Sequence, residues 1–365
     1  SVIVIFALAG AAIRIPVLLM PSGLILDLYE AVCRFTMKLP FNTLITGRPG
    51  WGRIIVYYLL ILTVIIPWKK TEKRDKMHLK AGKALLLAAA LVIIFIPRSA
   101  SAGVDMLNVG QGDLIVMKDA KGSTVIYDGG SSDVDLTGKY RLLPYLKYNG
   151  VRHIDAVFLS HPHLDHYSAL VELFENCEKE GIDVGALYVS HEYRFYPDEY
   201  RAVFDAAAKG DIPIIETDME KDLTFGDILV RPVYPYEHTD TGDVNDSSLV
   251  LLAQINGFSI LLTGDVTSRS DNELIACLDK RGVKHIDCLK VCHHGSAEAN
   301  SQRLINRLSP SCALISCGFS YGHPHREVLD RLSKAGVKYH ITRDEGQIRI
   351  KTHDNGFVLC KYPYL

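Results

Sequence analysis

Several patterns are missing from this sequence, and each absence excludes a class of protein. The eight cysteines form no Cys-x-x-Cys pair, which excludes a zinc ribbon or knuckle and favours buried thiols. The 40 basic and 42 acidic side chains nearly cancel, so any contact with nucleic acid must be local rather than a property of the whole chain. No internal repeat and no low-complexity segment is present, and 365 residues have room for about two domains.

The first hundred residues contain several apolar stretches. Residues 1–20 are apolar apart from Arg14, and residues 54–68 and 84–97 are uncharged. A full membrane span takes about 20 residues, so the two shorter stretches must borrow flanking residues or tilt little. Residues 24–35 repeat apolar side chains at helical spacing, which predicts an amphipathic helix. Buried helices of a soluble protein are the alternative, but three such runs favour membrane spans.

A basic loop between the last two apolar stretches predicts an orientation. Its basic residues are Lys69, Lys70, Lys73, Arg74, Lys76, Lys80 and Lys83. The positive-inside rule places this loop in the cytoplasm and the residues after Arg98 on the outer face. Four basic residues on the opposite side weaken this orientation without reversing it: Arg34, Lys38, Arg48 and Arg53. Seven cysteines after Arg98 suit a reducing compartment better, so a cytoplasmic domain stays open as the alternative.

Two regions are expected from this change of pattern. Residues 1–101 are predicted to be membrane-embedded helices, and residues 102–365 are predicted to form a separate α/β domain. Because Ser1 is not a methionine and the chain opens inside an apolar run, we expect the sequence to be a piece of a longer protein. No small-residue cleavage site follows the first apolar run, which argues against a secretory signal peptide.

Residues 102–365 alternate short apolar runs with helical patterns. Strands are predicted over residues 104–109, 113–117, 124–127, 154–159, 186–189, 228–233, 248–255, 258–263, 288–291 and 312–316. Helices are predicted over residues 141–148 and 199–208, and hairpin turns at residues 256–257 and 354–356. Strands at both ends with helices between them favour two sheets covered by helices, an αββα sandwich.

The most informative stretch follows the apolar run at residues 154–159. His161 and His163 are two residues apart, so on an extended strand end they point to the same face. Asp165 and His166 come next, where the chain should turn into a helix. Four ligand-type side chains within six residues are enough to begin two adjacent metal sites. Imidazole and carboxylate ligands suit zinc, manganese or iron and do not select one of them.

Other polar side chains also follow predicted strands. Asp128 ends one strand and could orient a liganding imidazole or merely cap a turn. Asp265 follows the strand at residues 258–263 and is the natural carboxylate to bridge two metals. His293 and His294 follow another strand, and His323 lies beyond the strand that ends at residue 316.

These motifs, in this order, resemble the metallo-β-lactamase superfamily and, within it, the C-terminal domain of the ComEC family of DNA-uptake proteins. The motifs are Asn108-Val-Gly-Gln-Gly-Asp113, His161-x-His163-x-Asp165-His166, Asn245-Asp-Ser-Ser-Leu249-Val-Leu, Thr263-Gly-Asp265, Lys290-Val-Cys-His-His-Gly-Ser296 and Tyr321-Gly-His-Pro324. The preceding apolar stretches resemble the end of that family's membrane-embedded competence domain. Asn108 departs from the family, which usually has Asp there, and the upstream part of the channel is missing.

The resemblance implies a two-metal site, with zinc or manganese as the divalent ions. One ion would take His161, His163, His294 and a bridging Asp265, and the other Asp165, His166, Asp265 and His323. The choice between His293 and His294 as ligand stays open, and the one that is not a ligand becomes the candidate general acid. Four residues would support these ligands from behind: Asp113, Asp128, Asn245 and Lys290. The catalytic residues expected from this assignment are Asp165, His293 and Asp265.

The leading hypothesis is therefore a metal-dependent phosphodiesterase that cuts DNA during uptake across a cell membrane, with other competence proteins as partners. Lys290, Arg303 and Arg326 are candidates for local DNA contacts, and no stripe of aromatic and basic residues indicates a platform for single strands. One alternative is a metal-stabilised module that guides DNA without turnover. Another is a hydrolase of a small ester or lactone, which the apolar first hundred residues disfavour.

Overall fold

The computed structural model describes residues 19–36, 43–66, 73–96, 101–236, 242–353 and 356–362. The chain divides into two compact units, Ser1–Leu44 and Ile45–Leu365. The first contains helix α2 (Met20–Thr36), which matches the predicted amphipathic helix. The division does not coincide with the boundary predicted near residue 101, and that boundary stays a prediction.

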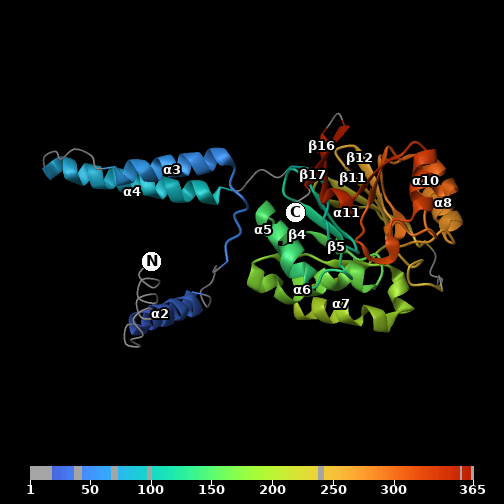
Figure 1. Ribbon diagram of the computed structural model, residues 1–365, viewed down its shortest axis with the longest axis horizontal. Helices are drawn as coiled ribbons and strands as arrows, with labels where there is room; N and C mark the ends of the chain where they lie inside the picture. The colour runs from blue at the N-terminus through green and yellow to red at the C-terminus, as the bar shows by residue number, and fades with distance from the viewer. Residues whose placement is uncertain are drawn as a thin grey trace. The chain divides into compact units, whose positions relative to one another are not determined.

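Two further helices precede the sheets. Helix α3 (Trp51–Ile65) and helix α4 (Lys73–Phe95) cover the two shorter apolar stretches and run side by side as a hairpin (Figure 1). Lys83 Nζ donates to the carbonyl oxygen of Val64 across this hairpin, at 2.6 Å. None of the described helices combines the length and apolarity needed to cross a membrane. The predicted spans are therefore unconfirmed, and residues 1–18 and 67–72, which hold parts of them and of the basic loop, lie outside the described residues.

The first large sheet has eight strands in the order β17-β16-β1-β2-β3-β5-β7-β8. Their bounds are β1 Gly103–Met106, β2 Leu114–Lys118, β3 Thr124–Gly129, β5 Ala156–Phe158, β7 Leu187–Val189, β8 Ile214–Glu216, β16 Gln347–His353 and β17 Gly356–Tyr362. From β3 to β8 neighbouring strands are parallel, and the remaining pairs are antiparallel. The carboxyl ends of β3, β5 and β7 therefore lie at one edge of the sheet.

The second large sheet has seven strands in sequence order from β9 to β15. Their bounds are β9 Leu223–Phe225, β10 Ile228–Tyr234, β11 Val250–Ile255, β12 Phe258–Leu262, β13 Cys288–Lys290, β14 Cys312–Ile315 and β15 Lys338–Ile341. Strands β12 to β15 are parallel to one another. Strands β4 (His153–Ile154) and β6 (Asp183–Val184) form a separate parallel pair.

Three buried apolar clusters divide the domain into four layers. The middle cluster joins side chains of both sheets, such as Tyr127 of β3 and Leu251 of β11. A second cluster packs α5 (Leu143–Asn149), α6 (Leu164–Glu180) and α7 (Pro197–Lys209) on the outer face of the first sheet. The third packs α8 (Asp271–Lys280), α9 (Gln302–Leu308) and α10 (Arg326–Lys334) on the outer face of the second sheet (Figure 1). The predicted αββα sandwich is confirmed.

Local differences from the predicted elements have simple causes. The predicted strand at residues 154–159 is divided into β4 and β5, because β4 pairs with β6 whereas β5 pairs with β3. Strands β8, β9 and β15 are short and partly exposed, and they were not predicted. The turn at residues 256–257 has the positive φ angles expected of Asn-Gly. Strands β16 and β17 form the last predicted hairpin, whose turn residues 354–355 lie outside the described residues.

Candidate metal centre

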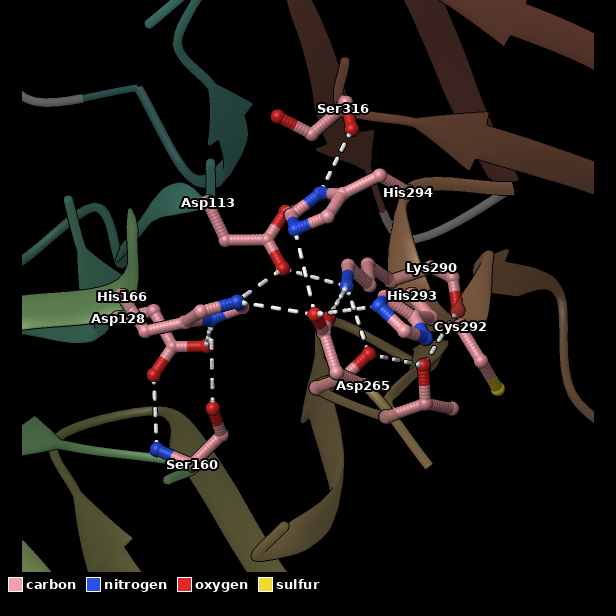
Figure 2. A network of polar contacts seen from close by, with 12 residues as sticks. Asp113, Asp128, Ser160, His166, Asp265, Lys290, Cys292, His293, His294 and Ser316 are labelled. Carbon is pink, nitrogen blue, oxygen red and sulfur yellow. Dashed lines mark hydrogen bonds and ion pairs between the residues drawn. The ribbon is translucent and has the colours of Figure 1, made fainter. Parts of the chain in front are cut away.

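The predicted site residues gather where the carboxyl ends of parallel strands from both sheets meet. Asp113 precedes β2, Asp128 lies in β3, and the histidine motif links β5 to α6. From the other sheet, Asp265 follows β12 and Lys290 ends β13. Figure 2 shows Asp113, Asp128, His166, Asp265 and Lys290 converging from the two sheets. This convergence follows from the fold, because ligands bind at the carboxyl ends of parallel strands in open α/β sheets.

His166, Asp265 and His294 form the centre of this cluster. The Nε2 atoms of His166 and His294 each lie 3.3 Å from Asp265 Oδ2. Asp165 Oδ2 is also 3.3 Å from His294 Nε2, and Asp165 Oδ1 is 4.0 Å from His166 Nε2. Asp113 completes the group, since one ligand atom from each of Asp113, His166, Asp265 and His294 lies within 4.8 Å of the others.

Hydrogen bonds behind the two imidazoles fix which nitrogen faces the cluster. His166 Nδ1 lies 2.9 Å from Asp128 Oδ2, and His294 Nδ1 lies 2.9 Å from the carbonyl oxygen of Ser316. Because a carbonyl oxygen and a carboxylate only accept, both Nδ1 atoms carry a proton and donate it. This arrangement leaves the two Nε2 atoms pointing inward, as in metal sites where an outer partner orients each histidine.

His161 and His163 lie at the side of the cluster. The His161 ring centroid is 4.2 Å from that of His166, and His161 Nε2 is 3.1 Å from His163 Nδ1. On its far side, His161 Nδ1 faces two hydroxyl groups, those of Ser160 at 2.9 Å and Ser248 at 3.3 Å. The pair therefore lies against the same cluster with its nitrogens close enough to share one ion.

Lys290 is fully buried and forms an ion pair with Asp113. Its Nζ also donates to Gly264 O at 2.8 Å and lies 3.5 Å from Asp265 Oδ1. The prediction that Lys290 contacts DNA is wrong, because a residue with no exposed surface cannot reach a polymer in solvent. Its charge is instead directed at the carboxylates of the cluster.

The donor set fits a divalent metal. His166 Nε2 and His294 Nε2 are buried and have no hydrogen-bond partner in the part of the chain that the structure describes. With neutral imidazoles, the carboxylates of Asp113, Asp165 and Asp265 face a single ammonium group, that of Lys290. The excess of negative charge in a buried place is costly unless a cation compensates it. A divalent ion bound by the two free nitrogens would satisfy both requirements.

The electrostatics of the metal-free cluster support this reading. Burial alone would lower the pKa of His294, but Asp265 and Asp113 outweigh it and raise the pKa to about 10. The pKa of His166 is likewise raised well above its usual value, since Asp265, Asp128 and Asp165 overcome its burial. In return, His294, His166 and Lys290 hold the pKa of Asp265 well below its usual range despite its burial. Without metal, protons therefore occupy the positions that a cation would take.

Metal binding should consequently release protons. At about pH 8 the metal-free chain carries a second ring proton on His294, whose pKa is about 10, and this proton must leave before Nε2 can bind an ion. We expect release of about one proton per ion from His294 at this pH, seen as binding heats that change with the ionisation heat of the buffer. Binding heats independent of the buffer would contradict this.

The same shifts predict how the stability of the metal-free chain depends on pH. Raised imidazole pKa values stabilise the fold fully below the unfolded value of about 6.5. For His294 this stabilisation fades as the pH rises through its folded pKa of about 10. The melting temperature of the metal-free chain should therefore fall as the pH is raised from about 6.5 to about 10.

Unusual backbone conformations place the histidines after β13. His293 and His294 both have left-handed φ angles, 47° and 51°. Such angles are costly for residues other than glycine and are found where the surrounding structure holds them for function. The turn aims His294 into the cluster, while His293 stays 27% exposed with its Nε2 3.7 Å from Asp265 Oδ2. Gly130 is also required, since a Cβ there would lie 2.5 Å from the backbone nitrogen of His166.

The remaining predicted residues lie farther out. His323 Nδ1 is 3.2 Å from Gln111 Nε2, and the His323 ring centroid is 6.3 Å from that of His294. Burial and the neighbouring His294 and His293 lower the pKa of His323 to about 4. Asn245 acts through its backbone, because its carbonyl oxygen accepts a hydrogen bond from the Ser248 hydroxyl at 2.7 Å.

Several residues of the site had not been singled out from the sequence. Ser160 and Ser248 contact His161, the Ser248 hydroxyl also accepts from the Asp265 N–H at 3.0 Å, and the Ser316 carbonyl orients His294. Serines carry no ligand signal of their own, although Ser248 lies inside a recognised motif. His191 lies two residues after β7 and is buried beside Glu192.

Comparison with known protein families identifies the superfamily to which the chain belongs. The signature described as "Metallo-beta-lactamase superfamily" matches residues 107–318, more than half of the chain. This protein belongs to the metallo-β-lactamase superfamily.

The predicted resemblance to the ComEC family is confirmed. "ComE operon protein 3" of Bacillus subtilis is 27% identical over 85% of this chain and 41% of the relative. "Competence protein ComA" of Neisseria gonorrhoeae is 26% identical over 65% of this chain and 30% of the relative. "Endoribonuclease ysh1" of Emericella nidulans is 28% identical over 46% and 20%. The chain spans less than half the length of each.

Proposed function

We propose that this chain is a metal-dependent phosphodiesterase that cleaves DNA during its uptake by the cell. The observation that carries the proposal is the pair of inward-facing, unpartnered Nε2 atoms of His166 and His294 beside Asp265. The names of the similar competence protein and endoribonuclease support nucleic acid as the substrate class.

The distances favour a definite division of ligands. One ion would be held by Asp165, His166, Asp265 and His294, in which each histidine Nε2 lies 3.3 to 4.0 Å from an oxygen of each carboxylate. A second would be held by His161 and His163, with Asp265 as the carboxylate that could contribute to both sites. We propose this in place of the grouping of His294 with His161 and His163 that the sequence favoured. His323 remains a candidate outer ligand of the first ion.

When bound, divalent ions supply Lewis acidity toward a phosphoryl group and make a water molecule nucleophilic at neutral pH. The protein's own residues prepare the site for this. Asp128 and Ser316 hold the two imidazoles in one orientation, and Lys290 holds Asp113 and Asp265 in place. The buried position of these groups removes competing water and keeps their dipoles fixed.

His293 is the proposed proton donor to the leaving oxygen. It is partly exposed, and its Nδ1 has no hydrogen-bond partner among the described residues. Replacing His293 with Gln should lower DNA cleavage by about 100-fold or more, the usual loss when a general acid is removed. Hydrolysis of a p-nitrophenyl phosphodiester should fall far less, because p-nitrophenolate leaves without a proton. Equal losses for both substrates would show that His293 has another role.

The cellular setting is also proposed rather than observed. We propose that residues 1–101 belong to a multi-pass membrane region, that residues 102–365 form the hydrolase on the outer face, and that other competence proteins are partners. The similarity to competence proteins supports a membrane setting. Proteolysis of sealed spheroplasts against inverted vesicles would test the side of the membrane.

Cleavage assays test the function itself. The full chain would be stripped of metal, reloaded with manganese or zinc, and incubated with labelled single- and double-stranded DNA. The control is the double substitution Asp165→Ala, His166→Ala. We expect metal-dependent cleavage that the control lacks. A folded, metal-loaded chain that cuts neither DNA would overturn the proposal and favour a module that guides DNA without turnover.

A further inference from the structure

Two aromatic side chains project into solvent beside the metal centre. Phe319 is 86% exposed and Tyr321 is 72% exposed, the highest values among the large apolar side chains described in residues 102–365. Both lie in the loop from residue 316 to residue 323, which joins β14 to His323. Exposing large aromatic surface to water is unfavourable. Two exposed aromatic side chains next to a candidate active site therefore suggest that a ligand covers them when it is bound.

The backbone of this loop is held firmly at several points. The Ser316 hydroxyl donates to Gly112 O at 2.6 Å, and the Cys317 N–H donates to Thr342 Oγ1 at 3.1 Å. The Ser320 hydroxyl donates to Asp133. Tyr321 itself has a left-handed φ of 59°, an outlier for a bulky residue. The aromatic rings are thus displayed by a fixed scaffold, which reduces the entropy lost on binding.

Ring contacts connect this loop to the metal cluster. The Tyr321 ring centroid lies 6.1 Å from that of His323, with 32° between the planes, and His323 in turn lies 6.3 Å from His294. Arg343 links the Phe319 ring to His323. Its Cζ lies 5.6 Å from the Phe319 ring centroid, and its Nη1 donates to His323 O at 2.7 Å. The exposed Tyr321 ring therefore lies beside His323, the candidate outer ligand, and one imidazole away from His294.

We propose that Phe319 and Tyr321 form a stacking platform for unpaired bases of a single-stranded nucleic acid whose backbone enters the metal centre. This inference rests on the proposed function. Aromatic side chains in single-strand binding sites stack on bases of any sequence, because every base has a π-face. Bases in a duplex are already stacked on one another, so the platform selects unpaired strands. Two aromatic residues are too few to form a stripe in the sequence.

Binding of labelled oligonucleotides by the metal-free full chain tests the platform without requiring turnover. The probes are a short oligothymidylate and an abasic strand of the same length. Phe319→Ala and Tyr321→Ala should each weaken thymidylate binding by roughly tenfold or more. They should leave abasic binding unchanged, because the backbone contacts are intact. Tyr321→Phe should bind like the unaltered chain, and Tyr321→Leu should bind like Tyr321→Ala because a leucine has no ring.

A matched control and separate outcomes distinguish base stacking on the two rings from the proposed cleavage of DNA. Val358→Ala, at another exposed apolar side chain on β17, should change neither affinity. Unchanged thymidylate binding by the Phe319→Ala, Tyr321→Ala double variant would overturn the platform and leave a protein partner as the occupant of the two rings. An equal loss on both probes, or full binding by Tyr321→Leu, would also overturn base stacking. Failure of metal-dependent cleavage, with ring-dependent binding retained, would instead count against the proposed function alone.

Discussion

Replacing Asp265 with alanine should abolish metal-dependent DNA cleavage. Asp265 Oδ2 lies 3.3 Å from the inward nitrogens of both His166 and His294, so its carboxylate is the group that both histidines share. Loss of an outer partner of a metal ligand already costs about 10- to 100-fold in affinity or activity. Loss of the shared carboxylate should exceed about 100-fold, measured as the initial rate at saturating manganese.

Two further variants test whether the loss comes from the charge of Asp265 itself. Asp265→Asn keeps the shape but removes the charge, and it should lose activity nearly as completely. Asp227→Ala removes a surface carboxylate paired with Lys121 at 2.6 Å and should cleave at the normal rate. The fold of Asp265→Ala would be checked by circular dichroism. Normal cleavage by a folded Asp265→Ala chain would remove Asp265 from the site.

Replacing Lys290 with methionine should produce the largest loss of stability. Lys290 is fully buried, and Asp113 and Asp265 raise the pKa of its ammonium group above its usual value despite its burial. Removing one partner of a buried ion pair leaves the other uncompensated, which costs about 3–5 kcal/mol. We expect this loss in the free energy of unfolding of the metal-free chain, measured by urea denaturation.

The surface pair supplies the matched control. Lys121→Met should leave the unfolding midpoint nearly unchanged, because the Lys121–Asp227 pair is exposed to water. Adding Asp113→Asn to Lys290→Met should recover part of the lost stability, since the orphaned carboxylate is then removed. If Lys290→Met unfolds at the normal urea concentration, the buried pair does not hold the cluster together.

The fold was largely readable because its strands are apolar and its turns carry glycine. Long central strands such as β10 and β12 match the predicted runs closely. Strands β8 and β9 were missed because each has three residues, none of them buried, and they lack a pattern of their own. The run at residues 154–159 is divided because its first part pairs with β6 and its second with β3, a change of partner that no local pattern encodes.

The candidate site was partly readable for a related reason. The spacing of His161, His163, Asp165 and His166 crowds them at a strand end whatever the rest of the chain does. The pairing of His294 with His166 depends instead on a left-handed turn and on where the second sheet docks. Burial of Lys290 likewise results from the packing of the sheets and cannot be read from its sequence neighbours. Its position close to His293 and His294 in the sequence therefore suggested a DNA contact that its burial excludes.

The most direct test of the metal centre is a manganese titration of the metal-free chain, with bound ion and DNA cleavage measured in the same samples. The account predicts that cleavage rises in proportion to ions bound at the cluster and that both are lost in the Asp165→Ala, His166→Ala chain. Ions bound without cleavage, or cleavage that persists in that double variant, would contradict it.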